Sequence, residues 1–417
     1  MEKSFRTRYD IIFVLLIISF LSVSCILKTK ERHYCSDTPT ARLTLALRAG
    51  TYADVIKSCL PAFEKENNIM CTVMEFSEDA LHKAVSENPE GKYDLCMVDG
   101  SWMAEFTSNG ALANLTELGY KLDDDIISAT KSICYSDGSL YLAPYYGNVT
   151  VLLYNKIMLK EAGYTPETVD SLEDIYKICL FQKKRHNLGF MIRGDTENNI
   201  VVDFLPILLA HGAWVVDENN YPTVNTKEFA EAMEMYMKLL KTGRSAKKND
   251  FIAAIANKSA AFGIGWPGWY TPTRNSPLDY IAFSGKATKD GKKYNANIYG
   301  IWTLGISEKS ANKKATALLL GYLMDKNVQR KTVETGGVPC RYSSLKDPEV
   351  IKKFPQYKPV CDALESGIYR PVMRNWKDFY TILGKEMRLI ISGEKNISDG
   401  LRSAQEKLEA EITKDTK

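Results

Sequence analysis

Aromatic and polar side chains gather at the turns and strand ends of this chain. A sugar presents flat C–H faces and edges of hydroxyl groups, so a site for it needs aromatic rings and planar polar groups within the apolar walls that small-molecule pockets share. The aromatic candidates are Tyr52, Trp102, Tyr145, Trp266, Trp269, Tyr270, Trp302 and Trp376, and the polar candidates are Thr51, Asp99, Asn148 and Arg341. Together these residue types favour a binding site for a sugar.

The tryptophans must be weighed against ordinary burial, because most tryptophan side chains are largely buried in the core. Trp214 follows the end of an expected helix, and we assign it to the core. Trp266 and Trp269 differ, since Gly265, Pro267 and Gly268 place them in an irregular turn. Loops commonly carry binding residues, so contact with a ligand is the favoured interpretation for these two.

Other candidates keep two interpretations. Asp99 could instead cap the helix that follows it, and Arg341 could form only a surface ion pair. Trp302 could face away from the site, because neighbouring residues of a strand point to opposite faces.

Catalytic motifs occur only by coincidence. Residues 263–268 match G-x-G-x-x-G, but Trp266, Pro267 and Pro272 prevent the long helix that a dinucleotide site requires. Residues 310–313 and 241–243 match the S-x-x-K and K-T-G motifs of serine β-lactamases, but in reversed order. The four histidines are scattered and no cysteines form a C-x-x-C pair. We therefore expect no catalytic residue, metal or cofactor.

The first 25 residues predict export. Lys3, Arg6 and Arg8 precede the apolar run 11–21, and Cys25 follows small residues at the expected cleavage site. This is typical of a bacterial lipoprotein signal, in which residues 1–24 are removed and Cys25 is lipidated. The alternative is an uncleaved anchor, because residues 11–27 are uncharged over a length at the low edge of a membrane span. Either way, the body of the protein is held at the outer face of the membrane.

Composition places the remaining 393 of the 417 residues in two domains. Residues 1–24 carry three basic and two acidic side chains, so the net charge falls from +3 for the whole chain to +2. Such a nearly neutral chain argues against a nucleic-acid partner. Eight of the nine cysteines follow Cys25, and their spacing leaves open whether any form disulfides.

The first half of the body alternates strands with helices. Strands are expected at 43–47, 69–76 and 95–98, with a helix after Gly50 that Thr51 would cap. This order predicts parallel βαβ units, in which ligands lie beyond the carboxyl ends of the strands. That rule singles out residues 50–52 and 99–102.

A second set of units begins with a strand at 149–154. The expected helices lie at 172–182 with a Ser171 cap, 200–211, 226–241, 311–324, 327–335, 376–391 and 398–414. The expected strands lie at 260–264, 280–283 and 298–306.

The chain resembles the family 1 extracellular solute-binding proteins of ABC importers, the maltose-binding-protein-like group. The strongest block is residues 141–166, which are similar to a P-Y-x-x-N-x-x-x-L-x-Y-N-K segment followed by A-G. Weaker blocks appear in family order over nearly the whole mature chain, at 43–60, 94–115, 301–322, 336–341 and 369–401.

The resemblance implies an α/β, two-lobed periplasmic-binding-protein-like fold of type II. Each lobe would be a mixed, mainly parallel sheet flanked by helices, and crossover strands near 144–149, 297–303 and 337–343 would join them. Residues 25–40 would form a lipidated tether. Lobe one would comprise 40–147 plus 301–340, and lobe two 148–300 plus 341–417.

The resemblance also implies a monomeric binding protein that captures a mono- or oligosaccharide in a hinged cleft and delivers it to the membrane subunits of an ABC importer. One alternative keeps the fold but binds another solute, such as a glycerol phosphodiester, for which Arg48 and Arg341 are the obvious cations, or a polyamine. A third hypothesis is a secreted hydrolase that acts on carbohydrates with two carboxylates.

Overall fold

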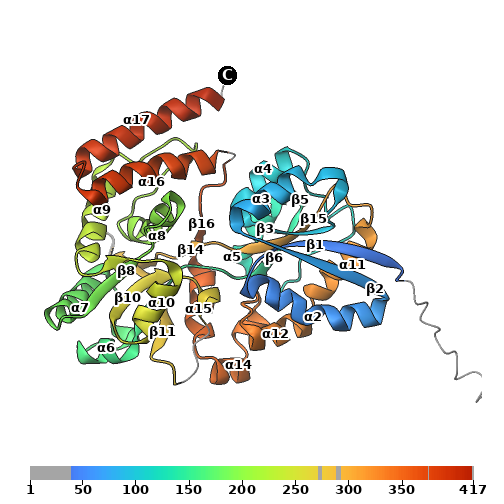
Figure 1. The fold of residues 1–417 in the computed structure, drawn as a ribbon, viewed down its shortest axis with the longest axis horizontal. Coiled ribbons are helices and arrows are strands. Elements are labelled where there is room, and N and C mark those ends of the chain that lie inside the picture. The colour runs from blue at the N-terminus through green and yellow to red at the C-terminus, as the bar shows by residue number, and fades with distance from the viewer. Residues whose placement is uncertain (1–38, 271–274, 288–292, 374, 416–417) are drawn as a thin grey trace, which may run out of the picture. The chain divides into compact units, whose positions relative to one another are not determined.

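A computed structural model describes residues 39–270, 275–287, 293–373 and 375–415, and the described residues from 41 onward belong to one compact unit. Two five-stranded sheets organise it, one in each lobe (Figure 1). The sheet of the first lobe has the order β2-β1-β3-β15-β6. Its strands are β1 (Ala41–Arg48), β2 (Ile69–Phe76), β3 (Leu95–Asp99), β6 (Leu142–Tyr146) and β15 (Trp302–Ile306).

The sheet of the second lobe has the order β11-β7-β10-β8-β9. Its strands are β7 (Val151–Asn155), β8 (Leu188–Ile192), β9 (Arg244–Ser245), β10 (Ala260–Gly265) and β11 (Leu278–Ile281). In the first sheet β15 alone runs opposite to the other four strands, and in the second β7 alone does so. Each sheet is therefore mixed and mainly parallel, which confirms the predicted fold class.

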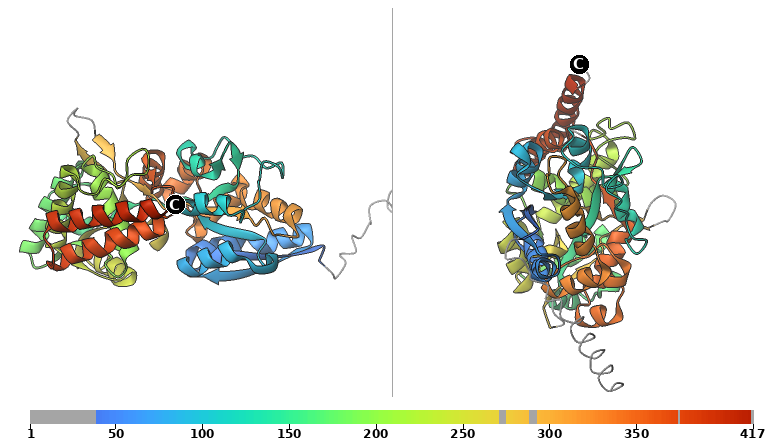
Figure 2. Two further views of the ribbon diagram at one scale, coloured as in Figure 1. Left: turned by 90° about the horizontal axis from the view of Figure 1, so that it is seen from above. Right: turned by 90° about the vertical axis from the view of Figure 1, so that its right-hand side faces the viewer.

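Helices flank both sheets. Those of the first lobe are α2 (Thr51–Asn67), α3 (Glu78–Glu87), α4 (Met103–Ser108), α5 (Ser128–Lys131), α11 (Lys313–Leu323) and α12 (Lys326–Thr332). Those of the second are α6 (Lys156–Glu161), α7 (Leu172–Lys184), α8 (Glu197–Ala210), α9 (Lys227–Leu240), α10 (Lys248–Ala256), α16 (Trp376–Ser392) and α17 (Ile397–Asp415). The last two, coloured red in Figures 1 and 2, pack on each other, and α16 also packs on α8.

Three chain segments connect the lobes. The first lies between β6 and β7, and the second between β14 (Ile298–Tyr299) and β15. The third was expected near 337–343, but there the chain enters α13 (Tyr342–Leu345), α14 (Pro348–Lys353) and α15 (Tyr357–Ser366). Helix α15 packs against α5 of the first lobe and against β7 and β11 of the second. The chain then passes through β16 (Ile368–Tyr369), which pairs with β14, before it reaches α16.

Short antiparallel pairs lie outside the two sheets: β4 (Tyr135–Ser136) with β5 (Ser139–Leu140), and β12 (Ser284–Ala287) with β13 (Lys293–Asn295). The expected Thr51 cap is wrong, because Gly50 occupies the N-cap position of α2 with φ 87° and no side chain caps this end. No helix within the described ranges is long and apolar enough to cross a membrane. The seven described cysteines are free thiols, whereas Cys25 and Cys35 lie outside the described residues.

Candidate functional site

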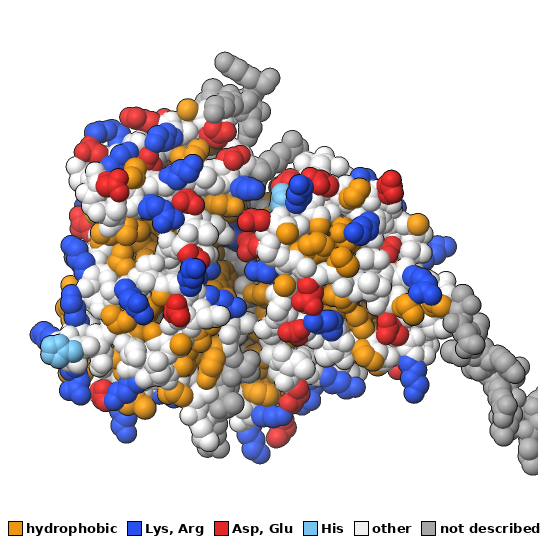
Figure 3. Space-filling view, in the orientation of Figure 1, with side chains coloured by type: hydrophobic (Ala, Val, Ile, Leu, Met, Phe, Trp, Pro, Cys, Tyr) orange, Lys and Arg blue, Asp and Glu red, His pale blue; other side chains and the backbone are white. Residues whose placement is uncertain are grey.

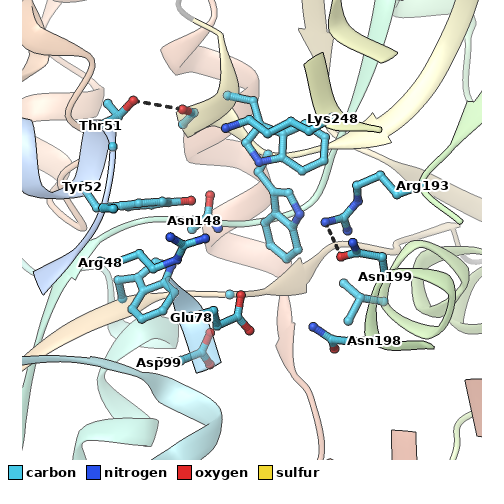
Figure 4. A pocket seen from close by; sticks show the side chains of 18 of the residues that line it. Arg48, Thr51, Tyr52, Glu78, Asp99, Asn148, Arg193, Asn198, Asn199 and Lys248 are labelled. Atoms are coloured by element: carbon cyan, nitrogen blue, oxygen red, sulfur yellow. Dashed lines mark hydrogen bonds between the residues drawn. The ribbon is translucent and has the colours of Figure 1, made fainter. Parts of the chain in front are cut away.

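A cavity of about 350 Å³ lies where the carboxyl ends of the parallel strands of both sheets face each other (Figure 4). We call it the interlobe cavity. In the first lobe its residues follow β1, β2 and β3, and in the second they follow β8, β9 and β10. This is the position that open α/β sheets use for ligands. Around the hollow between the lobes, basic and acidic side chains are exposed (Figure 3).

Seven of the sequence candidates line this cavity. They are Thr51, Tyr52, Asp99, Asn148, Trp266, Trp269 and Trp302. The structure adds eight charged or amide side chains, of which only Arg48 was named from the sequence, as a cation for an anionic solute. They are Arg48, Glu78, Arg193, Asp195, Asn198, Asn199, Lys248 and Arg370.

The aromatic walls come from both lobes. Tyr52 stands in the first turn of α2, and its ring centroid lies 5.7 Å from that of Trp302, the first residue of β15. Trp266 follows β10 directly and is 6% exposed. Trp269 ends the short 3₁₀ segment Pro267–Trp269, which the glycine and proline of this turn produce. The lobes also touch here, since Thr51 Oγ1 donates a hydrogen bond of 3.4 Å to the carbonyl oxygen of Gly268.

Four buried polar atoms at the cavity have no hydrogen-bond partner among the described residues, namely Arg48 Nε, Asn148 Oδ1, Asn198 Oδ1 and Arg370 Nε. The Oδ1 atom of Asn148 accepts no hydrogen bond from any described residue, although this side chain is buried between β6 and β7. The Nε atom of Arg370 is likewise unpartnered and buried. A buried polar atom without a partner costs roughly 1–3 kcal/mol. A polar solute that supplies the missing donor and acceptor would remove this cost.

The carboxylate of Asp99 makes two kinds of contact. Its Oδ1 accepts hydrogen bonds from the backbone nitrogen and hydroxyl of Ser101, so it caps the short helix after β3. The same atom accepts from Arg370 Nη2 at 2.6 Å, in an ion pair that is buried on both sides. The position of Asp99 is therefore compatible both with its role as a helix cap and with contact to a ligand in the cavity.

The environment shifts the pKa of three side chains in the cavity. Glu78 is the first residue of α3, and desolvation followed by the charge of Asp99 raises the pKa of its carboxyl. Burial raises the pKa of the Tyr52 phenol, which stays neutral. Desolvation, together with the charges of Arg48 and Arg193, lowers the pKa of Lys248.

Trp102 and Trp376 lie in a smaller adjoining cavity of about 40 Å³, which shares Glu78, Asn198 and Arg370 with the interlobe cavity. The Trp102 ring packs edge-on against Trp302, with ring centroids 5.5 Å apart.

The remaining candidates do not line either cavity. Tyr145 is buried, 3% exposed, and its hydroxyl has no described partner. Tyr270 donates a hydrogen bond to Ser276 Oγ at 3.2 Å. Arg341 is buried and donates to Gln329, Asp123 and Asp125, so its charge is paired with carboxylates at the edge of the core rather than directed into the cavity.

Some of the missed residues had a signal in the sequence. Arg193 follows β8 directly, so the strand-end rule would have found it had the strand 188–192 been recognised. Lys248 begins α10, a helix that was not predicted from the sequence. Arg370 had no comparable signal, because it lies in the irregular segment between β16 and α16.

The model of the bacterial extracellular solute-binding protein family matches residues 60–359. Among curated proteins, the chain is 21% identical over 301 residues to a "probable amino-acid ABC transporter periplasmic-binding protein" of Sinorhizobium fredii, covering 69% of this chain and 68% of that one. It is 23% identical over 299 residues to a maltodextrin-binding protein of Bacillus subtilis, covering 68% and 69%.

Solved structures of similar fold include a maltose-bound protein of T. maritima, with a TM-score of 0.76 and 19% identity over 88% of this chain and 99% of that one. Another is an ABC transporter solute-binding protein of Agrobacterium radiobacter in complex with ribitol, with a TM-score of 0.77 and 20% identity over 89% and 99%.

Proposed function

Because the chain belongs to the bacterial extracellular solute-binding protein family, we propose that it captures a carbohydrate in the interlobe cavity and delivers it to the membrane subunits of an ABC importer. The observation that carries this proposal is the cavity itself, in which aromatic rings from both lobes surround an unpartnered buried acceptor, Asn148 Oδ1. The maltodextrin-, maltose- and ribitol-binding relatives support a hydroxylated solute.

Each cavity residue has a chemical role in this proposal. The rings of Tyr52, Trp266, Trp269 and Trp302 cover the C–H faces of the sugar. Asn148 accepts a hydrogen bond from a hydroxyl group, which satisfies its Oδ1 atom.

The volume of the cavity bears on the length of the solute. At about 350 Å³ the cavity lies near the lower end of the ~300–1,000 Å³ typical of small-molecule sites, which favours a short saccharide. Trp102 and Trp376 would contact only a solute that extends past Arg370 into the adjoining cavity. The proposed contacts do not include Tyr145, Tyr270 and Arg341, which line neither cavity.

Binding would work by a shift in population between open and closed forms. Tyr52 and Trp302 belong to the first lobe, whereas Trp266 and Trp269 belong to the second. A solute that contacts both sets gains its full contact energy only when the lobes are closed, so it favours closure. The closed form is what the membrane subunits would recognise.

We also propose that the protein acts as a monomer held at the extracytoplasmic face of the membrane by a lipid on Cys25. The signal pattern of residues 1–25 supports this anchor. Metabolic labelling with a radioactive fatty acid tests it, because Cys25→Ser should abolish incorporation of the label.

A binding screen tests the function. The full-length protein, in a mild detergent, is titrated with mono- and disaccharides while its tryptophan fluorescence and melting temperature are followed. A solute at 100 times its Kd should stabilise the folded state by about 2.7 kcal/mol.

Matched variants locate the site. Trp266→Phe should weaken binding, whereas Trp214→Phe should leave it unchanged, because Trp214 packs beside the core of the second lobe and lines neither cavity. Equal effects of the two variants would contradict the proposed site. Release of shorter sugars from an oligosaccharide would instead favour a hydrolase.

A further inference from the structure

The positive charges at the interlobe cavity are unequally neutralised. Arg370 pairs with Asp99, and Arg193 pairs with the buried carboxylate of Asp203. Arg48 and Lys248 also line the cavity, but neither forms an ion pair with any described residue. Two cations from opposite lobes thus face the same space without a counter-ion.

Arg48 keeps most of its hydrogen-bonding capacity free. It is the last residue of β1, and its Nη1 atom donates a hydrogen bond to the carbonyl oxygen of Phe76 at 3.3 Å. Its Nε atom is buried and has no described partner. Since a guanidinium presents five N–H donors in a planar fork, Arg48 can bind a carboxylate or phosphate through two of them.

Lys248 approaches the cavity from the second lobe. It begins α10, and its Nζ atom lies 5.9 Å from the centroid of the Trp269 ring. The guanidinium of Arg193 lies over the same ring at 4.8 Å. The charges of Arg48 and Arg193 help to lower the pKa of Lys248. Asp195 also lines the cavity, where its Oδ1 atom accepts a hydrogen bond from Asn199 Nδ2 at 2.8 Å and its carboxylate forms no ion pair with Lys248. This part of the cavity therefore has a positive potential.

Backbone groups add to this potential. The N-termini of α2 and α10 border the cavity through Thr51 and Lys248, and neither end has a side-chain cap. Uncapped N–H groups and the positive end of the helix dipole favour an anion.

Two of the three acidic residues that line the cavity, Glu78 and Asp99, lie toward a different part of it. Figure 4 shows Glu78 beside Asp99, away from Lys248 and on the other side of Arg48. Glu78 forms no hydrogen bond or ion pair with a described residue and is only partly buried. This end suits the hydroxyl groups of a solute, which donate hydrogen bonds to carboxylates.

We propose that the solute is an acidic carbohydrate whose carboxylate or phosphate group is bound between Arg48 and Lys248, with its hydroxyl groups toward Glu78 and Asp99. The inference rests on the proposed function, since it names the class of sugar that the same cavity takes. It also supplies a reason for closure, because an anion between cations of opposite lobes removes the repulsion that otherwise keeps them apart.

The test compares acidic sugars with their neutral counterparts. The full-length protein in detergent is titrated with D-glucuronate, D-galacturonate and D-glucose 6-phosphate, and in parallel with D-glucose and D-galactose. Binding is measured by calorimetry at low and at high salt. An acidic sugar should bind at least tenfold more tightly than its neutral counterpart, and this difference should shrink as salt rises.

Charge variants identify the anion site. Arg48→Gln and Lys248→Gln should each weaken binding of the acidic sugar about 10- to 100-fold, the scale of a hydrogen bond to a charged group. Lys247→Gln is the matched control, because it removes the same charge from the neighbouring exposed residue, which does not line the cavity. It should change binding less than twofold.

The outcomes separate the two proposals. Equal binding of neutral and acidic sugars, unaffected by the two variants, overturns the acidic solute and leaves the carbohydrate function standing. Binding of inorganic phosphate or glycerol 3-phosphate but of no sugar supports the anion site and overturns the carbohydrate. Failure of every acidic compound to bind overturns the inference.

Discussion

Gly300 offers a direct test of how the interlobe cavity is held in shape. It lies between β14 and β15, in one of the segments that connect the lobes, and its backbone nitrogen donates to the carbonyl oxygen of Asn148 at 2.9 Å. A Cβ atom at this position would lie 2.8 Å from Cζ3 and 2.9 Å from Cη2 of Trp266. It would also lie 3.4 Å from Nδ2 of Asn148.

The size of the effect follows from these distances. Carbon atoms in contact prefer separations of about 3.5–4.0 Å, so in Gly300→Ala the Trp266 ring must move by roughly 1 Å. The ring is only 6% exposed and Pro267 follows it, so its movement is restricted except toward the interlobe cavity that it lines. Overpacking of this kind costs about 1–3 kcal/mol of unfolding free energy. Because both displaced side chains belong to the proposed site, we expect solute affinity to fall about tenfold, or about 1.4 kcal/mol.

Two quantities are measured for each variant. The unfolding free energy comes from urea unfolding monitored by circular dichroism, and the affinity comes from calorimetric titration with the solute found in the screen. Gly321→Ala is the control. Gly321 lies inside α11, and a Cβ atom added there would have no described neighbour within 4 Å, so alanine should raise the unfolding free energy by about 0.5–1 kcal/mol and leave affinity unchanged. If Gly300→Ala unfolds and binds like the wild type, the close packing of Gly300 against Trp266 is wrong.

Three further variants test single residues. Arg341→Met should lower the unfolding free energy by about 1–3 kcal/mol without changing affinity, because it leaves the buried Gln329 Oε1 without its donor, whereas Asp123 and Asp125 stay partly solvated. A loss of affinity alone would instead place Arg341 in the binding site. Tyr145→Phe should raise the unfolding free energy by about 1 kcal/mol in urea titrations, since the lost hydroxyl is buried and unpartnered, and a large decrease would reveal a hidden hydrogen bond. Glu78→Gln should stabilise the protein at pH 7, because a raised carboxyl pKa destabilises the folded state above that pKa. This gain should vanish as the pH falls below the ordinary value of 4.5, so a gain that persists at pH 3 would contradict the shift.

Regular elements with a clear pattern were predictable from sequence. The strand 69–76 was predicted to the residue. The predicted cap Ser171 accepts a hydrogen bond from the backbone at the start of α7. Thr226, expected as the first residue of its helix, is instead the N-cap of α9. The strand expected over 298–306 is wrong as one element, since the chain breaks at residues 300–301, where it passes between the lobes.

The site was only partly predictable, for a physical reason. Trp266 and Trp269 could be placed because glycine and proline in their own segment enforce an irregular turn. Arg48 and Lys248 could not be assigned to one site from the sequence, because 200 positions separate them. They line one cavity only because the carboxyl ends of the strands of the two sheets face each other. Local patterns fix the elements, but such convergence depends on tertiary structure.

The connecting segments link binding to the motion between the lobes. Each of the three contributes a residue to the interlobe cavity: Asn148 between β6 and β7, Gly300 between β14 and β15, and Arg370 after β16. The first two are joined by the hydrogen bond from Gly300 to Asn148, and β14 pairs with β16. Rotation of one lobe against the other must change backbone dihedrals in these segments. A solute bound to Asn148 and Arg370 therefore contacts the connecting segments themselves. Its contact energy would differ between the open and the closed form at these segments, as well as at the two walls of the cavity.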